Sequence, residues 1–383
     1  SVVTDKGKNH LSPGKTPGTN LQFLSFFTSI IRAVYEHHYL LMASIASLNN
    51  SFRLGGNEAP PAVMSVFIGS TLDKLINSIE NMDNTADFFD TASSVLDIAK
   101  KIPEIHPDNT DRNRTSPFAF TGNRFEFRAV GSSVNVASAA YVLNTAVAQQ
   151  LFRFRELVDG HIAAGTDKNE AILKVIRQFI IESKSIRFEG NGYSEEWRKE
   201  SAKRGLRGLE SVPEAYKAFL EKNSVELFES MKVLTRREVE ARFEVMNETY
   251  TKKLQIEARV LGDLVINHVI PTAIKFQNTL IENVRGIKEL YGEDQYKDMC
   301  VQQLKMITKI SGYIESLRVN VHEMIEARKR ANVIEDVAQK AEVYTNTVLP
   351  YMGVIREKSD KLEMIVDDEL WPLPKYRELL LLR

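Results

Sequence analysis

Apolar residues recur along most of this chain at the spacing of helices. The longest strongly apolar stretch, residues 21–48, predicts a buried helix, and residues 137–157 predict a second helix rich in small residues. From residue 212 onward the whole pattern is helical, with one regular stripe made of Ile307, Ile310, Ile314, Leu317, Val321 and Met324. Such a stripe requires a partner helix, so we expect an antiparallel hairpin or small bundle over residues 256–365.

One stretch alternates with a period of two instead. In the sequence NRFEFRA, two phenylalanines separate Arg124, Glu126 and Arg128. This pattern is typical of a half-buried strand, whose charged side chains share one face. Two interpretations fit the strand equally well by itself. It is either an anion site with a built-in metal ligand or an exposed surface with ordinary ion pairs.

A loop rich in glycine and proline, residues 49–61, carries two further charged residues. Arg53 and Glu58 are separated by Leu-Gly-Gly-Asn. Two glycines let the backbone approach a ligand closely, and the proline pair that follows fixes the course of the loop. The alternative is a surface turn whose charges face water.

Two other polar features are interpreted as structural. His37 and His38 are adjacent within the expected helix, and neighbours on a helix point about 100° apart, which is unsuited to binding one metal ion. The loop of residues 187–208 has five Lys or Arg residues in its last eleven positions. Runs of this kind usually face solvent, so we favour a solvated loop over a phosphate site.

Composition excludes several classes of protein. The chain has 383 residues, 43% of them apolar and 26% charged, which is ordinary for a globular protein with two domains or one large domain. A net charge of -1 gives no reason to expect nucleic acid or a membrane as partner. No apolar run approaches the ~20 residues that span a bilayer. The single cysteine, Cys300, excludes an intrachain disulfide and fits a reducing compartment, so we expect a cytoplasmic protein.

Two spaced motifs together resemble the glutamine synthetase superfamily. RLGGNEAPP, which contains Arg53 and Glu58, resembles the loop in which an arginine precedes a glycine-containing spacer and Glu-Ala-Pro. NRFEFRAVGSSVN resembles the following strand of that family, where a basic residue, a glutamate and an arginine alternate ahead of a helix. Two segments are similar to sequences of the type III branch: NRTSPFAFTGNRFEFRAVGSS and the helical tail ending in LWPLPKYRELL. The similarity covers essentially the whole chain, but only the C-terminal half of the family.

This resemblance implies ATP-dependent joining of glutamate and ammonia through γ-glutamyl phosphate. Arg53 would bind the substrate carboxylate or the transferring phosphoryl group, and Arg128 would bind the carboxylate of glutamate, because a guanidinium donates two parallel hydrogen bonds. Glu58 would help to form the ammonium site and close a flap over the intermediate. Glu126 would ligate the Mg²⁺ or Mn²⁺ that bridges the ATP phosphates.

The resemblance assigns three more arginines to the nucleotide. Arg124 would lie on the nucleotide side of the strand. Arg112 or Arg114 matches the phosphate-clamping arginines of the family, although the spacing here is not identical. Phosphoryl transfer depends mostly on positioning and charge neutralisation, and arginines supply both.

A fold and an assembly are implied as well. We expect an α+β protein in which residues 1–255 are the C-terminal part of a glutamine synthetase catalytic domain, with a small antiparallel sheet and helices. Residues 256–383 would form an all-helical C-terminal domain. Active sites of the family lie between neighbouring subunits of a ring. The expected partners are therefore glutamate, ammonia, ATP and further copies in a ring-shaped homo-oligomer, with no nucleic acid and no membrane.

Most metal-ligating glutamates of the family precede the part matched here. We therefore expect this chain to be a C-terminal fragment with about half an active site, inactive by itself. The alternative is a non-enzymatic helical module for oligomer assembly or regulation that retains a synthetase-like strand. That alternative rests on the stripe from Ile307 to Met324 and on the basic loop of residues 187–208.

Overall fold

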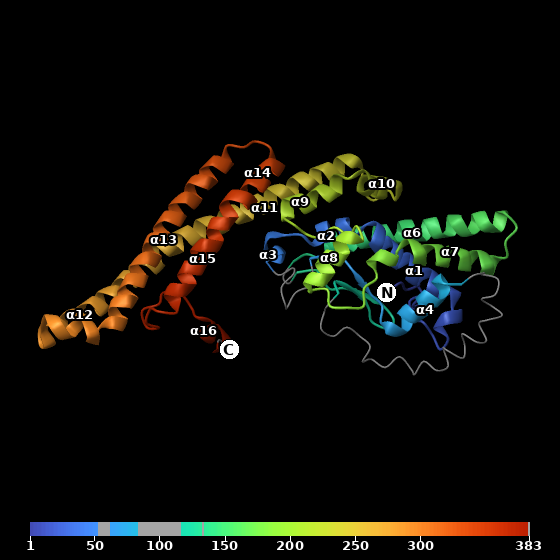
Figure 1. Ribbon diagram of the computed structural model, residues 1–383. Coiled ribbons are helices and arrows are strands. Elements are labelled where there is room, and N and C mark those ends of the chain that lie inside the picture. The colour runs from blue at the N-terminus through green and yellow to red at the C-terminus, as the bar shows by residue number, and fades with distance from the viewer. Residues whose placement is uncertain (53–61, 83–115, 132–133, 382–383) are drawn as a thin grey trace. The chain divides into compact units, whose positions relative to one another are not determined.

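A computed structural model gives the architecture of most of the chain (Figure 1). It describes residues 1–52, 62–82, 116–131 and 134–381. Two compact units are present, Ser1–Phe243 and Glu244–Arg383. The predicted domain boundary after residue 255 falls inside helix α11 (Arg236–Leu264), and the division into domains at that point stays a prediction. Among the described residues, no helix is both long and apolar enough to cross a bilayer.

The first unit contains a three-stranded sheet in the order β1-β2-β3. Strand β1 (Val66–Phe67) runs parallel to β2 (Phe118–Phe120), and β2 runs antiparallel to β3 (Phe125–Phe127). The expected α+β fold is confirmed, but the sheet is mixed and not antiparallel as predicted. Because the chain between β1 and β2 is long, and includes helix α4 (Ser70–Glu80), it can return in the same direction, as a parallel pair requires.

A tight turn joins the two antiparallel strands. The Thr121 N–H donates to the carbonyl of Arg124 at 2.8 Å, which closes a two-residue loop. Gly122, the first residue of that loop, has a φ of 94°. Glycine adopts this conformation without the steric cost of a side chain, and hairpins of this length favour it at that position.

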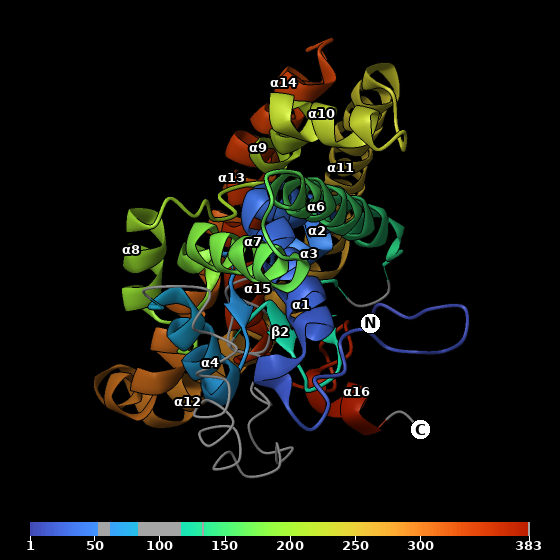
Figure 2. The same cartoon turned by 90° about the vertical axis from the view of Figure 1, so that its right-hand side faces the viewer.

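Phenylalanine side chains cover one face of the sheet and pack against helix α1 (Leu21–Glu36). Phe118 and Phe125 stack with ring centroids 5.1 Å apart, and Phe27 of α1 meets the ring of Phe120 edge-on at 5.0 Å. Figure 2 shows α1 beside β2 in this arrangement. Burial of aromatic surface on this face leaves the opposite face for polar side chains.

The rest of the first unit is mostly helical. The apolar stretch expected as one helix over residues 21–48 is helical but divided, because α1 ends at Glu36 and α2 (His38–Ile45) and α3 (Leu48–Ser51) follow. Figure 1 shows α6 (Ala137–Ala163) and α7 (Lys168–Glu182) side by side, and both contact α1. The unit closes with α9 (Val212–Tyr216) and α10 (Lys222–Ser230).

The predicted loop of residues 187–208 is wrong in part, because it contains helix α8 (Glu195–Lys203). Ser194 accepts a hydrogen bond from the Trp197 N–H and caps the helix start. The Trp197 side chain is buried and stacks on Phe188 with ring centroids 3.8 Å apart. The buried Trp197 and the Ser194 cap account for a short helix in which most other positions are charged.

The second unit is all-helical, as expected. It continues α11 into a π-helix and then α12 (Ile270–Met299), followed by α13 (Val301–Asn332), α14 (Val337–Val343), a second π-helix, α15 (Leu349–Glu363) and α16 (Tyr376–Leu381). The apolar stripe on α13 is confirmed as a packing surface, since it buries Ile310, Leu317, Val321 and Met324. Helix α13 packs against both α12 and α15, so the predicted hairpin is present.

His37 and His38 have structural hydrogen-bond partners. The Nε2 atom of His37 lies 2.9 Å from the Gln149 side-chain oxygen. His38 donates from Nδ1 to the carbonyl of Tyr35, and its Nε2 accepts the N–H of Arg207. These contacts join α2 to α6 and to the chain after α8.

We predict that these two histidines destabilise the fold in mild acid. Burial lowers the pKa of His37 and of His38 below the usual 6.5. Near and below about pH 6.5 the unfolded chain binds protons that the folded chain does not, so stability is lost as the pH falls. His37→Gln cannot titrate, and its unfolding midpoint should fall less between about pH 7.5 and 5.5 than that of the wild type. His161→Gln is the control, and equal pH slopes for the His37 variant and the wild type would contradict the prediction.

Candidate functional site

Strand β3 and its two flanking residues carry the charged residues singled out in the sequence. Glu126 pairs with Ala119 across the ladder, so its side chain lies on the face opposite the phenylalanines. The Arg128 N–H donates to the carbonyl of Pro117 at 2.8 Å, which continues the ladder past the end of the strand. The alternation in the sequence therefore predicts the strand and its polar face correctly.

Glu126 lies between two arginines on that face. Arg128 Nε donates to Glu126 Oε2 at 3.3 Å, and Arg124 Nε lies 3.5 Å from Glu126 Oε1. The two arginines differ in burial, because the Arg128 side chain is 12% exposed and the Arg124 side chain is 59% exposed. Arg128 is thus held in place by the sheet, whereas Arg124 extends into solvent.

Four predicted site residues lie outside the described part of the chain: Arg53, Glu58, Arg112 and Arg114. The structure therefore brings together three of the seven, Arg124, Glu126 and Arg128. The flanks of the two motifs do meet, since the side chain of Asn50 donates to the carbonyl of Ala129 at 3.0 Å. Sequence reasoning missed Asn50, which lies three residues before Arg53.

The described residues do not form a complete metal site. No group of three or more His, Cys, Asp or Glu side chains within them could hold an ion. Glu126 has the hard oxygen atoms that Mg²⁺ and Mn²⁺ prefer, but both of its oxygens face arginine nitrogens. Glu126 therefore fits as one ligand of a divalent ion, and the remaining ligands would have to come from elsewhere.

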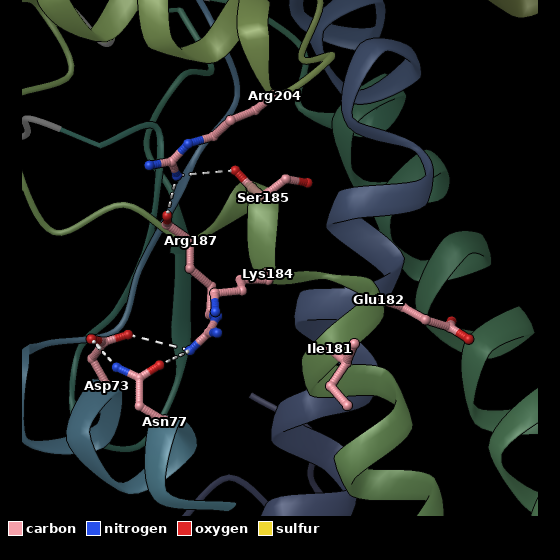
Figure 3. A pocket seen from close by; sticks show the side chains of 8 residues that line it. All are labelled: Asp73, Asn77, Ile181, Glu182, Lys184, Ser185, Arg187 and Arg204. Carbon is pink, nitrogen blue, oxygen red and sulfur yellow. Dashed lines mark hydrogen bonds and ion pairs between the residues drawn. The ribbon is translucent and has the colours of Figure 1, made fainter. Parts of the chain in front are cut away.

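A cavity of about 610 Å³ lies apart from these three residues, beside α4 and the chain that follows α7. Figure 3 shows the side chains that line it: Asp73, Asn77, Ile181, Glu182, Lys184, Ser185, Arg187 and Arg204. Its charged side chains already have partners, such as Glu80 for Lys184, and Arg204 donates to the carbonyls of Ser185 and Arg187. We therefore assign this cavity no part in the chemistry.

Arg187 is a buried arginine that was not predicted from the sequence, because it begins the loop interpreted as solvated. Its side chain is 5% exposed and forms ion pairs with Asp73 at 3.3 Å and with Glu80 at 3.2 Å. The neighbouring Phe188 N–H donates to the carbonyl of Val66 in β1. The network thus attaches α4 to the edge of the sheet.

Three other arginines of the 187–208 segment have acidic partners. Arg198 pairs with Glu195, Arg204 with Glu200, and Arg207 with Glu221 at 2.5 Å. These pairs neutralise much of the positive charge that a phosphate site would need. The pairs therefore agree with the interpretation that this segment does not bind phosphate.

Comparisons with known proteins identify the relatives of this chain. Residues 171–288 match the family described as glutamine synthetase C-terminal domain. The chain is 47% identical to a glutamine synthetase of Bacteroides fragilis (strain YCH46), over 99% of this chain and 52% of that protein. It is 38% identical to a type-3 glutamine synthetase of Dictyostelium discoideum, over 100% of this chain and 52% of that protein.

The chain is a relative of the glutamine synthetases. The resemblance recognised from two motifs is therefore confirmed, including its type-3 branch. A glutamine synthetase of Butyrivibrio fibrisolvens is a third relative, at 31% identity over 99% of this chain and 53% of that protein. The chain spans about half the length of the curated glutamine synthetases that it matches.

Proposed function

We propose that this chain takes part in the ATP-dependent ligation of glutamate and ammonia to glutamine through γ-glutamyl phosphate. The observation that carries the proposal is the row of Arg124, Glu126 and Arg128 on the polar face of β3. It occurs in a chain that is related to glutamine synthetases along nearly its whole length.

In this proposal the two arginines of the strand have different ligands. Arg128 is largely buried and is held at Nε by Glu126, so its guanidinium has a fixed direction. A fixed, planar group suits the carboxylate of glutamate, which it binds through parallel hydrogen bonds. Arg124 is mostly exposed, so its guanidinium is accessible to the phosphates of ATP.

Glu126 is proposed as one ligand of a divalent ion, Mg²⁺ or Mn²⁺. Such an ion neutralises phosphate charge when it is bound. Arg53 is proposed to bind substrate, Glu58 to form the ammonium site, and Arg112 or Arg114 to contact phosphate. These three roles follow from the resemblance of the motifs to the family.

The proposal concerns a complete synthetase that includes this sequence. Each relative has about twice the matched length, so further metal ligands are expected from residues other than those present here. We propose that this chain alone is inactive and that active sites form between neighbouring copies in a ring. The cytoplasmic location expected from the single cysteine stays a prediction.

The alternative of a non-enzymatic helical module is not favoured by any described contact. The stripe from Ile307 to Met324 is used inside the second unit, and the basic residues of the 187–208 segment largely have internal partners. The alternative requires these surfaces to bind a partner protein, but they are largely used in contacts within the chain.

A γ-glutamyl transfer assay with Mn²⁺ and ADP tests the proposal. It uses the polypeptide that shows activity, whether this chain or a longer one that contains it. Glu126→Ala and Glu126→Gln should each lower the rate at least about a hundredfold, because a metal ligand and the partner of two arginines are lost together. Glu196→Gln, an exposed acid on α8, is the control and should keep the wild-type rate. Wild-type activity in both Glu126 variants would show that the site is assigned wrongly.

A further inference from the structure

The backbone directly after Arg128 leaves the sheet with a buried carbonyl group. The last ladder hydrogen bond is that of the Arg128 N–H, and the next residue, Ala129, is almost completely buried. A buried carbonyl without a donor is destabilising, so the end of this strand needs a hydrogen-bond partner from elsewhere in the fold.

Asn50 supplies that partner. Its Nδ2 group donates to the Ala129 carbonyl at 3.0 Å and to the Ile45 carbonyl at 2.9 Å. Ile45 is the last residue of α2, and Asn50 lies in α3 with 3% of its surface exposed. A single amide group therefore ties the end of a helix to the end of strand β3, and both of its hydrogens are used.

Two further contacts fix Asn50, one at its backbone and one at its side-chain amide. Its backbone N–H donates to the hydroxyl of Ser47, which caps α3. Gly131 lies against its amide, since a Cβ added at Gly131 would be 3.1 Å from Asn50 Oδ1 and 3.3 Å from Cγ. Glycine is the residue that fits here without displacing the amide, because both distances are tighter than ordinary van der Waals contact.

We infer that Asn50 is a positioning residue for substrate binding, which acts by fixing the backbone that aims Arg128. The inference rests on the proposed role of Arg128 toward glutamate. Two hydrogen bonds fix the backbone around Arg128: one from its own N–H to the sheet, and one from Asn50 to the carbonyl of Ala129. Without the second bond the strand end can shift, and a displacement near 1 Å of a binding group is enough to cost about a hundredfold in rate.

Three variants test this inference in the active synthetase. Asn50→Asp keeps the shape of the side chain but has no N–H donor and directs a carboxylate at two carbonyl oxygens. Gly131→Ala leaves the donor in place and pushes the amide aside. Tyr216→Phe is the matched control, because it removes a different buried hydrogen bond near the same helix end, from the Tyr216 hydroxyl to the carbonyl of Ala46 directly after α2.

Asn50→Asp and Gly131→Ala should each raise the KM for glutamate between about ten- and a hundredfold, with the KM for ATP nearly unchanged. Tyr216→Phe should change neither constant. Equal rises for glutamate and ATP, or the same effects in Tyr216→Phe, would mean a purely structural role and overturn the inference. If Arg128→Ala raises the KM for glutamate but Asn50→Asp and Gly131→Ala do not, the inference fails while the proposed function stands. If Arg128→Ala has no effect either, the proposed function itself fails.

Hydrogen exchange on this chain gives a second test that needs no activity. In Asn50→Asp the amides of residues 128–131 should exchange faster than in Tyr216→Phe, at matched unfolding midpoints. Unchanged exchange at these amides would overturn the inference, because the strand end would then be fixed without Asn50.

Discussion

Replacement of Arg128 by alanine should raise the KM for glutamate roughly a hundredfold. A charge-assisted hydrogen bond contributes about 1.5–3 kcal/mol, and a guanidinium donates two of them to one carboxylate. Arg128 is largely buried and is fixed at Nε by Glu126, so little of its binding energy is lost in ordering the side chain. Steady-state kinetics with glutamate and ATP varied separately would measure the effect.

Two further substitutions separate the contributions at this site. Arg128→Lys tests whether the planar pair of donors matters or only the charge, and Arg124→Ala tests the other arginine. Arg128→Lys keeps the charge but loses the planar pair of donors, so it should recover only a small part of the affinity for glutamate. Arg124→Ala removes the other arginine of Glu126 and should raise the KM for ATP but not for glutamate. A glutamate effect in Arg124→Ala equal to that in Arg128→Ala would mean that both act only through Glu126.

Replacement of Arg187 by methionine should destabilise the first unit by about 3–5 kcal/mol. The reason is that Asp73 would lose its buried cation, while Glu80 would keep only the exposed Lys184 as a cationic partner. Urea unfolding followed by Trp197 fluorescence is a suitable measurement, because Trp197 stacks on Phe188, the residue after Arg187. Trp371→Phe removes the other tryptophan of the chain from the signal.

Lys184→Met is the matched control for Arg187→Met. Lys184 also pairs with Glu80, at 2.6 Å, but its side chain is 63% exposed. Exposed ion pairs contribute about 0–1 kcal/mol, so this variant should unfold almost like the wild type. Equal effects of the two substitutions on the free energy of unfolding would show that the burial of Arg187 does not determine its contribution to stability.

Some residues of the candidate site could be found from the sequence because their signal is local. The alternation around Glu126 depends only on the period of a strand, and the turn before it depends on Gly122. Family resemblance then gave these residues a chemical role that the alternation could not. Asn50 and Arg187 have no such signal, since an asparagine in a loop and an arginine in a basic segment are usually exposed.

The sequence is sufficient to predict the helical second unit, the strand with its polar face, and the relation to glutamine synthetases. Each of these depends on residue spacing or on motifs along a continuous piece of chain. The parallel pairing of β1 with β2 and the hydrogen bond from Asn50 to the end of β3 became evident from the tertiary structure alone. Those features depend on hydrogen bonds and burial between segments that are far apart in the chain, and hydrophobic periodicity carries no information about which distant segments will meet.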